Sequence, residues 1–323
     1  MDYFFLISGL ILIILGSDKL TDGASAIAKR YGVSDLVVGL TIVAFGTSAP
    51  ELVISVLSAL DNSAELAIGN VVGSNIFNIL AIIGITAVVR PIVIEKSILS
   101  SDIPLVIISA IALFAMGSGP LLGDGPSRVV GRTDGIVLLL FFAIFMRYTF
   151  AQAKRPESQD DISAETPADM EVMPLWKSLF WVVAGLAGLV FGGNWFVDGA
   201  SGIASSLGVS EAVIGLTIVA AGTSLPELAT SVVSAIKGKP GMAVGNVIGS
   251  CIFNIFFILG AAATVRPLPF GKIGETDLLV LLGASILFWI AGWFFKKRTI
   301  TRVEGVFLAL CYIAYTVYLV VSA

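Results

Sequence analysis

The sequence has little charge and no histidine. Only 13% of its 323 residues are charged, whereas soluble domains carry about 25%, and 57% are hydrophobic. This composition excludes a water-soluble globular protein, and it excludes a disordered chain, which needs low hydrophobicity and high charge. The lack of histidine excludes Ser-His and Cys-His catalysis and His-ligated metal sites. With 19 basic residues and a net charge of −4, no broad basic face remains for nucleic acid.

Long apolar runs take the place of charge and predict an all-α polytopic membrane protein. A membrane-spanning helix needs about 20 mostly apolar residues. Ten segments meet this requirement: 3–29, 33–60, 66–89, 98–117, 133–150, 175–205, 209–236, 242–265, 276–295 and 303–322. One segment, 151–174, is instead rich in acidic residues and proline, which is typical of a solvated linker.

The basic residues predict the orientation of these spans. If the N-terminus lies outside, 14 Lys and Arg residues fall at the inner ends and loops, and 4 fall at the outer ones. The positive-inside rule therefore places both termini outside and the linker 151–174 in the cytoplasm. We expect a multi-pass protein of the plasma membrane.

The strongest signal in the sequence is an internal repeat. Residues 16–91 align with 192–267 without a gap, and 43 of the 76 positions are identical. The chain thus divides into a first five-helix repeat at 1–150, the linker at 151–174 and a second five-helix repeat at 175–323. Because each half has an odd number of spans, the second enters the membrane upside down. Such inverted repeats are typical of secondary transporters, whose substrates bind near the midplane between the repeats.

Glu51 and Glu227 occupy matching places in the two repeats, deep within apolar segments. A carboxylate at membrane depth costs several kcal/mol unless it is paired, protonated, or facing water or an ion. No Lys or Arg lies in the same segments, so a bound cation or a proton must balance each charge. The structural alternative is a protonated glutamate hydrogen-bonded to a neighbouring helix. Asp22 and Asp198 also match across the repeats, and for these we expect mainly structural roles.

The residues around each glutamate can supply further oxygen ligands. Gly46 and Pro50, like their counterparts in the second repeat, predict a helix break that frees backbone carbonyls. Threonine and serine four and three positions before the glutamate share its helix face. The candidate ligands in GLTIVAFGTSAPEL (39–52) and GLTIVAAGTSLPEL (215–228) are Ala44, Thr47, Ser48, Glu51, Ala220, Thr223, Ser224 and Glu227.

A second repeated motif reads GNVVGSNIFN at 69–78 and GNVIGSCIFN at 245–254. Its serine and last asparagine are four residues apart on one helix face and add hydroxyl and amide oxygens. These candidates are Ser74, Asn78, Ser250 and Asn254. We expect the glycines to allow close helix packing. For Asn70 and Asn246, an interhelical hydrogen bond and a gating contact both remain open.

The combined oxygen atoms suit hard cations such as Na⁺ and Ca²⁺. Two carboxylates balance one divalent or two monovalent cations. An empty, doubly charged site is costly to carry across a membrane, which predicts obligatory antiport.

At these motifs the chain resembles the cation/Ca²⁺ exchanger superfamily, specifically the prokaryotic Na⁺/Ca²⁺ exchangers, whose α-repeats read GTSxPE and GNxxGSxxxN. The resemblance implies an outside N-terminus, four short core helices around the ions and two long tilted helices that slide. It maps the family's ion ligands onto the twelve candidates above. In K⁺-dependent members an Asp at the position of Asn254 is linked to K⁺ transport, so Asn254 argues against K⁺ dependence. The linker is too short for regulatory Ca²⁺-binding domains.

Other functions remain as alternatives. An H⁺-driven Ca²⁺ or cation antiporter could use the same glutamates as proton carriers. A channel and an intramembrane enzyme are disfavoured, because no hydrated pore is evident and Gly-Thr-Ser is not a nucleophile elbow. We therefore expect a non-enzymatic transporter without a cofactor. Its expected partners are the lipid bilayer, Ca²⁺ and Na⁺, with H⁺ as the alternative; no protein partner is evident.

Overall fold

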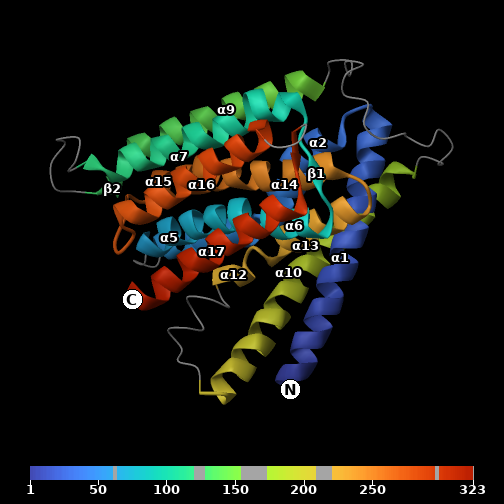
Figure 1. Ribbon diagram of the computed structural model, residues 1–323, viewed down its shortest axis with the longest axis horizontal. Helices are drawn as coiled ribbons and strands as arrows, with labels where there is room; N and C mark the ends of the chain where they lie inside the picture. Colours follow the sequence, from blue (N-terminus) through green and yellow to red (C-terminus); the bar gives the residue numbers. More distant parts are fainter. Residues whose placement is uncertain (61–63, 120–127, 154–172, 209–219, 295–297, 323) are drawn as a thin grey trace.

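The computed structural model describes residues 1–60, 64–119, 128–153, 173–208, 220–294 and 298–322, and within these it is almost entirely helical (Figure 1). Eight of the described helices are long and apolar enough to cross a membrane, and a bent helix pair makes nine if it counts as one span. The remaining expected span, 209–236, begins outside the described residues. Of this span the structure describes α12 (Ala220–Gly222) and α13 (Leu225–Ile236). The all-helical membrane fold is confirmed, but a count of ten helices is not.

The predicted bounds of the other nine spans agree with the structure within three residues. The first half comprises α1 (Asp2–Tyr31), α2 (Asp35–Val38), η1 (Gly39–Val43), α3 (Ala44–Thr47), α4 (Ala49–Leu60), α5 (Ala64–Ile76), η2 (Phe77–Ile82), α6 (Ile83–Val89), η3 (Ile98–Asp102), α7 (Ile103–Gly117) and α9 (Arg132–Ala153). After α10 (Leu175–Ser206), α12 and α13, the second half continues with α14 (Pro240–Ile252), η6 (Phe253–Leu259), α15 (Gly260–Val265), α16 (Glu275–Phe294) and α17 (Arg302–Ser322). The η segments are single stretches of π-helix, which the sequence pattern did not predict.

Two short strand pairs connect loops of the two halves. Strand β1 (Ile92–Val93) pairs antiparallel with β4 (Thr299–Ile300), and β2 (Val129–Val130) pairs antiparallel with β3 (Leu268–Pro269). The predicted alternation of spans puts β1 and β4 on one side of the membrane and β2 and β3 on the other. The pairing is consistent with that alternation.

The twofold symmetry extends further than the aligned repeat. The amide of Gly131 donates to the Asp134 carboxylate, and the amide of Thr301 donates to the Glu304 carboxylate, so α9 and α17 begin in the same way. A few residues on, Gly135 and Gly305 lie against the backbone of α15 and α6, where an added Cβ would meet a carbonyl oxygen at 2.8 and 2.7 Å. The outer helices α9 and α17 are therefore also related by the repeat, although their matching residues do not keep the sequence spacing of the aligned segments 16–91 and 192–267.

The long helices α1 and α10 run antiparallel and side by side at one edge of the bundle (Figure 1). Glycines allow this close approach. A Cβ on Gly16 would lie 2.8 Å from the Gly185 carbonyl oxygen, and one on Gly9 would lie 2.7 Å from the Gly192 carbonyl oxygen. The two helices therefore pack backbone against backbone along their length.

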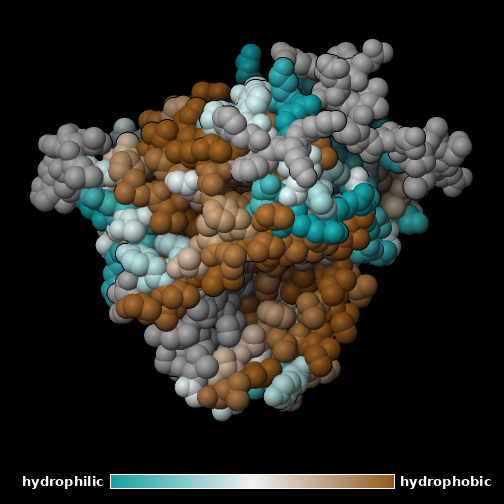
Figure 2. Space-filling view, viewed as in Figure 1, coloured by the Kyte–Doolittle hydropathy of each residue, from teal (hydrophilic) through white to brown (hydrophobic). Residues whose placement is uncertain are grey.

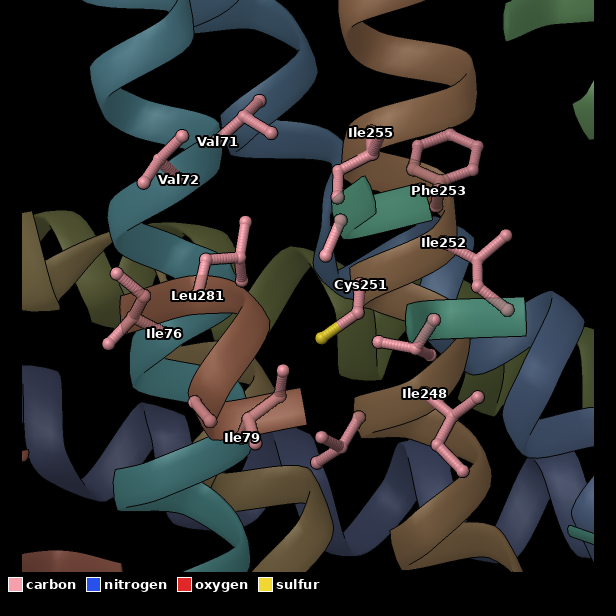
Figure 3. Close-up of a cluster of buried hydrophobic side chains, with 14 of the residues drawn as sticks. Val71, Val72, Ile76, Ile79, Ile248, Cys251, Ile252, Phe253, Ile255 and Leu281 are labelled. Atoms are coloured by element: carbon pink, nitrogen blue, oxygen red, sulfur yellow. The ribbon is translucent and has the colours of Figure 1, made fainter. Parts of the chain in front are cut away.

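The core lies between α5–α6 and α14–α15. In an 18-residue apolar stretch of each of these two spans 83% of the residues are buried, compared with 11% in the equivalent stretch of α17. Figure 3 shows α5 and α14 facing one another across apolar side chains, with Cys251 pointing into the space between them. The outer surface is mostly hydrophobic over α9, α17, α1 and α10 (Figure 2), as expected for helices that face lipid.

Candidate cation site

In both repeats the helix is interrupted three residues before the repeated glutamate. Ser48 (φ −83°, ψ 9°) separates α3 from α4, and Ser224 (φ −93°, ψ 8°) separates α12 from α13. The helices before and after Ser48 differ in direction by 47°. Pro50 and Pro226 follow in the first turn, where the missing N–H of proline costs no helical hydrogen bond. The predicted interruption is confirmed.

Glu51 and Glu227 are fully buried in the first turns of α4 and α13. Each accepts a hydrogen bond from a serine of the other repeat. Ser48 Oγ donates to Glu227 Oε1 at 2.8 Å, and Ser224 Oγ donates to Glu51 Oε1 at 3.2 Å. Each repeat thus supplies a serine that hydrogen-bonds to the glutamate of the other repeat. The sequence pattern alone could not specify this arrangement.

Six oxygen atoms at this site are buried and accept no hydrogen bond from the described part of the chain. They come in repeat-related pairs: Glu51 Oε2 and Glu227 Oε2, Ser74 Oγ and Ser250 Oγ, and Asn78 Oδ1 and Asn254 Oδ1. Unsatisfied buried polar atoms are rare because each costs free energy. A cluster of carboxylate, hydroxyl and amide oxygens left unpaired in this way fits the ligand set of a hard cation.

The remaining candidate ligands differ between the halves. Thr47 is buried and its hydroxyl donates to Asn246 Oδ1 at 3.1 Å, whereas Thr223 is half-buried and lines a cavity. The prediction that the break frees the Ala44 carbonyl is wrong, because this oxygen accepts the Ser48 N–H at 3.0 Å. Pro50 removes the donor that a continuous helix would offer to the residue four positions earlier, and Ala44 lies further back.

In the second half Ala220 begins α12, and the Ser224 N–H bonds to Ala221 at 3.2 Å. The two carbonyls are therefore in different backbone settings. The Ala44 oxygen also accepts the Thr47 hydroxyl at 3.4 Å, so a role in ion binding would require the ion to replace this long bond.

Asn70 and Asn246 make interhelical hydrogen bonds. Asn246 Nδ2 donates to the Glu227 carbonyl at 3.2 Å and to Ser231 Oγ at 3.0 Å. Asn70 Nδ2 makes the equivalent contacts with the Glu51 carbonyl at 3.4 Å and with Ser55 Oγ at 3.2 Å. These amides hold α5 to α4 and α14 to α13. Sequence reasoning missed the two serines, although they match across the repeats.

Asn75 is a second residue that sequence reasoning missed. Its Oδ1 accepts a hydrogen bond from Asn254 Nδ2 at 2.9 Å, and its Nδ2 donates to the Cys251 carbonyl at 3.1 Å. Because the amide nitrogen of Asn254 is held in this way, its Oδ1 is turned away from Asn75. Asn78 and Asn254 both lie in π-helical segments, which are frequent at functional sites.

Among the described residues, no basic side chain forms an ion pair with the two glutamates of the site. The ion pairs in the described residues involve Lys19, Lys237, Asp18 and Asp22, and none includes Glu51 or Glu227. Nor do the described residues contain a group of three or more His, Cys, Asp and Glu side chains that could hold a resident metal. Two carboxylates among neutral oxygens therefore define the electrostatics of the site.

The glycines of the second motif pack as expected. A Cβ on Gly245 would lie 2.7 Å from the Leu36 carbonyl oxygen, and one on Gly249 would lie 2.7 Å from the Leu40 carbonyl oxygen. This close approach brings α14 against α2 and η1 and carries Ser250 and Asn254 to the break at Ser48. By the symmetry of the repeat, Gly69 and Gly73 would pack against the counterparts of Leu36 and Leu40. Those counterparts fall within 209–219, outside the described residues.

A family model described as sodium/calcium exchanger protein matches residues 1–151 and 177–321. The chain belongs to the sodium/calcium exchanger family. Among individual exchangers, it is 32% identical to the sodium/calcium exchanger MaX1 of Methanosarcina acetivorans over 99% of this chain and 98% of that protein. It is also 35% identical to the inner membrane protein YrbG of Escherichia coli, over 89% of this chain and 87% of that protein.

Solved structures of the sodium-calcium exchanger NCX_Mj share the fold. The structure from crystals soaked with zero Na⁺ and Ca²⁺ has a TM-score of 0.81 and 32% identity, covering 98% of both chains. A structure of the same exchanger soaked with 10 mM Na⁺ and 10 mM Sr²⁺ has a TM-score of 0.80 and 33% identity. The predicted family is thus confirmed, and this exchanger has an all-helical membrane fold with its two repeats meeting at the buried glutamates.

Proposed function

We propose that this exchanger moves Ca²⁺ against Na⁺ across the plasma membrane by alternating access. The observation that supports this proposal most strongly is the set of six buried oxygen atoms, three from each repeat, that have no hydrogen-bond partner among the described residues. The proposed ligands are Ala44, Thr47, Ser48, Glu51, Ser74, Asn78, Ala220, Thr223, Ser224, Glu227, Ser250 and Asn254. The names of the relatives, which include sodium/calcium exchangers, support this choice of ions.

The charge of the site explains why transport is an exchange. Glu51 and Glu227 are fully buried and lack a basic partner in the described residues, so the ionised site needs cations to be stable. One Ca²⁺ or two Na⁺ ions neutralise the pair. The empty, ionised site is penalised by desolvation and by repulsion between the carboxylates. The carrier therefore reorients when it is loaded.

The fold provides the parts for this reorientation. The helix pair α1 and α10 lies beside the core formed by α5 and α14, and its glycine-lined packing makes it a unit that can move against that core. We assign ten spanning helices, both termini outside, the linker 151–174 in the cytoplasm, and no enzymatic activity. The distribution of basic residues and the pairing of β1 with β4 and of β2 with β3 support this topology.

Ion exchange in proteoliposomes tests the proposal. Vesicles loaded with Na⁺ are diluted into Na⁺-free buffer containing radioactive Ca²⁺, with and without K⁺, and at two pH values with proton gradients collapsed by ionophore. We expect Ca²⁺ uptake that requires internal Na⁺ and is unchanged by K⁺. Uptake driven by a proton gradient without Na⁺ would instead identify an H⁺-driven antiporter with the glutamates as proton carriers.

A further inference from the structure

Lys237, at the end of α13, joins that helix to α1 through two carboxylates. Its Nζ lies 2.6 Å from Asp18 Oδ1 and 2.6 Å from Asp22 Oδ1, and it also donates to the Asp18 carbonyl at 2.9 Å. Asp18 and Asp22 are one helical turn apart and therefore face the same way. One turn before Lys237 on α13, the hydroxyl of Ser234 lies 3.2 Å from that of Thr21, which is between the two aspartates on α1. Together these contacts close the space between α1 and α13.

A buried polar stripe leads from the cation site to this contact. On α13 it consists of Glu227, Thr230, Ser231 and Ser234, each no more than 1% exposed. Their spacing of three and four residues puts them on one helix face. The Thr230 hydroxyl is buried and has no hydrogen-bond partner among the described residues. Ser231 bonds to Asn246 of α14 and Ser234 to Thr21 of α1, but the unpartnered Thr230 hydroxyl costs free energy that is recovered if this face is hydrated in another state.

By the repeat, α10 and α4 correspond to α1 and α13, and between α10 and α4 the structure has an open space instead of a closed contact. A cavity of about 310 Å³ lies between α10, α4 and the start of α13, and it reaches Thr223 and Pro226 next to the cation site. Its α10 wall includes four residues whose repeat counterparts on α1 form the closed contact. Gly193, Asn194, Val197 and Asp198 correspond to Ser17, Asp18, Thr21 and Asp22.

The two repeats differ in charge at the positions that correspond to the ion pair between α1 and α13. The sequence counterpart of Lys237 is Asp61, which lies outside the described residues, so the basic residue that contacts the α1 aspartates matches an acidic residue in the other repeat. Asp198, the counterpart of Asp22, is exposed, whereas Asp22 is half-buried and ion-paired with Lys237. The tie between α1 and α13 is therefore specific to one side of the molecule.

We propose that Lys237, Asp18 and Asp22 form a latch that holds the cytoplasmic passage closed. The Lys237 ammonium occupies the two carboxylates that would otherwise attract cations at the inner entrance. When the repeats exchange conformations, α1 moves away from α13, Lys237 leaves Asp18 and Asp22, and the stripe from Ser234 to Glu227 becomes the inner ion path. Lys237 acts on transport by positioning α1. The inference rests on the proposed function for the assignment of this side as cytoplasmic.

Cysteine labelling tests the latch. Ser17 is fully buried, and its counterpart Gly193 lines the open cavity, so Ser17 should line the inner passage when that passage opens. The S17C variant is exposed to a membrane-impermeant maleimide in inside-out vesicles, with the unmodified chain giving the background from Cys251 and Cys311. We expect Lys237→Gln to raise the labelling rate about threefold, since partly exposed ion pairs contribute modestly. Lys237→Arg should restore the slow rate.

Lys19→Gln is the matched control. Lys19 Nζ also pairs with Asp18, at 3.2 Å, but it belongs to α1 itself and contacts Trp181 of α10, so it does not bridge to α13. Its removal should leave labelling unchanged. Asp22→Asn serves as a second latch variant if Lys237→Gln does not fold, as judged by size-exclusion chromatography.

The outcomes are separable. Unchanged labelling in folded Lys237→Gln or Asp22→Asn would overturn the latch, as would an equal increase in Lys19→Gln. A latch-dependent increase seen only in right-side-out vesicles would retain the latch and overturn the assigned orientation. Ca²⁺ uptake is measured on the same variants: its absence from the parent chain, with labelling still dependent on Lys237, would overturn the proposed function and leave the latch standing.

Discussion

The cation site and the two passages beside it use the internal repeat in different ways. At the site the halves make matched bonds: Ser48 to Glu227 is repeated by Ser224 to Glu51. Beside the site the symmetry is lost, because α1 is tied to α13 whereas a cavity lies between α10 and α4. The chemistry that must serve both orientations of the carrier is symmetric. The contacts that distinguish the two orientations are not.

Neutralising one glutamate should have the largest effect on this symmetry. Glu51→Gln or Glu227→Gln keeps the shape but removes half of the negative charge that the cations balance. Loss of one partner from a buried charged set costs about 3–5 kcal/mol, so we expect Na⁺-dependent Ca²⁺ uptake to fall by about 100-fold or more in either variant. Uptake in proteoliposomes measures the effect, with thermal stability in detergent as the folding control. Near-normal uptake in either variant would contradict the site.

The cross-repeat serines should come next. Ser48→Ala and Ser224→Ala each remove a hydroxyl that donates to a buried carboxylate of the opposite repeat. Hydrogen bonds to charged groups contribute about 1.5–3 kcal/mol, so we expect the apparent Ca²⁺ affinity to fall by about tenfold or more, and by similar factors in the two variants. The Ca²⁺ dependence of uptake measures this. Ser8→Ala, at a half-buried serine far from the site whose hydroxyl bonds within α1, should be silent. A loss confined to one half would show that the site is not symmetric.

Overpacking the α1–α10 contact should affect stability more than ion binding. In Gly16→Ala the new Cβ would meet the Gly185 carbonyl oxygen at 2.8 Å and the Leu189 nitrogen at 2.9 Å, both backbone atoms that cannot move aside. Overpacking typically costs about 1–3 kcal/mol, so the melting temperature should drop. Gly283→Ala on α16 is the control, because its Cβ would meet no described atom within 4 Å. Equal melting temperatures for the two variants would mean that α1 and α10 are not in close contact.

The sequence was sufficient for the membrane spans that the structure describes and for the repeated helix break before each buried glutamate, since apolar length and a repeated motif are local signals. It was insufficient for the pairing between halves. Ser48 and Ser224 lie in nearly identical segments, so bonding within a repeat and across repeats are equally compatible with the pattern. The π-helical segments were also missed, because a change from i+4 to i+5 bonding leaves no mark on composition. The Ala44 carbonyl is not freed by the break, because Pro50 removes the donor to the carbonyl of residue 46 and leaves the Ser48 N–H to bond to Ala44.

The smallest effect we predict concerns a difference between the repeats beside the site, where Asn75 of the first repeat corresponds to Cys251 of the second. Asn75 accepts from Asn254 Nδ2, so Asn75→Ala should let the Asn254 amide rotate and weaken apparent Ca²⁺ affinity by about fivefold, as expected for the loss of a neutral hydrogen bond worth about 1 kcal/mol. Cys251 receives the Asn75 amide on its backbone carbonyl, which Cys251→Ala preserves, so that variant should stay close to the parent. The Ca²⁺ dependence of uptake decides between them. If Cys251→Ala weakened affinity as much as Asn75→Ala does, the cysteine side chain would be an orienting group of equal weight, and the two halves would hold their asparagines in equivalent ways despite the different residues.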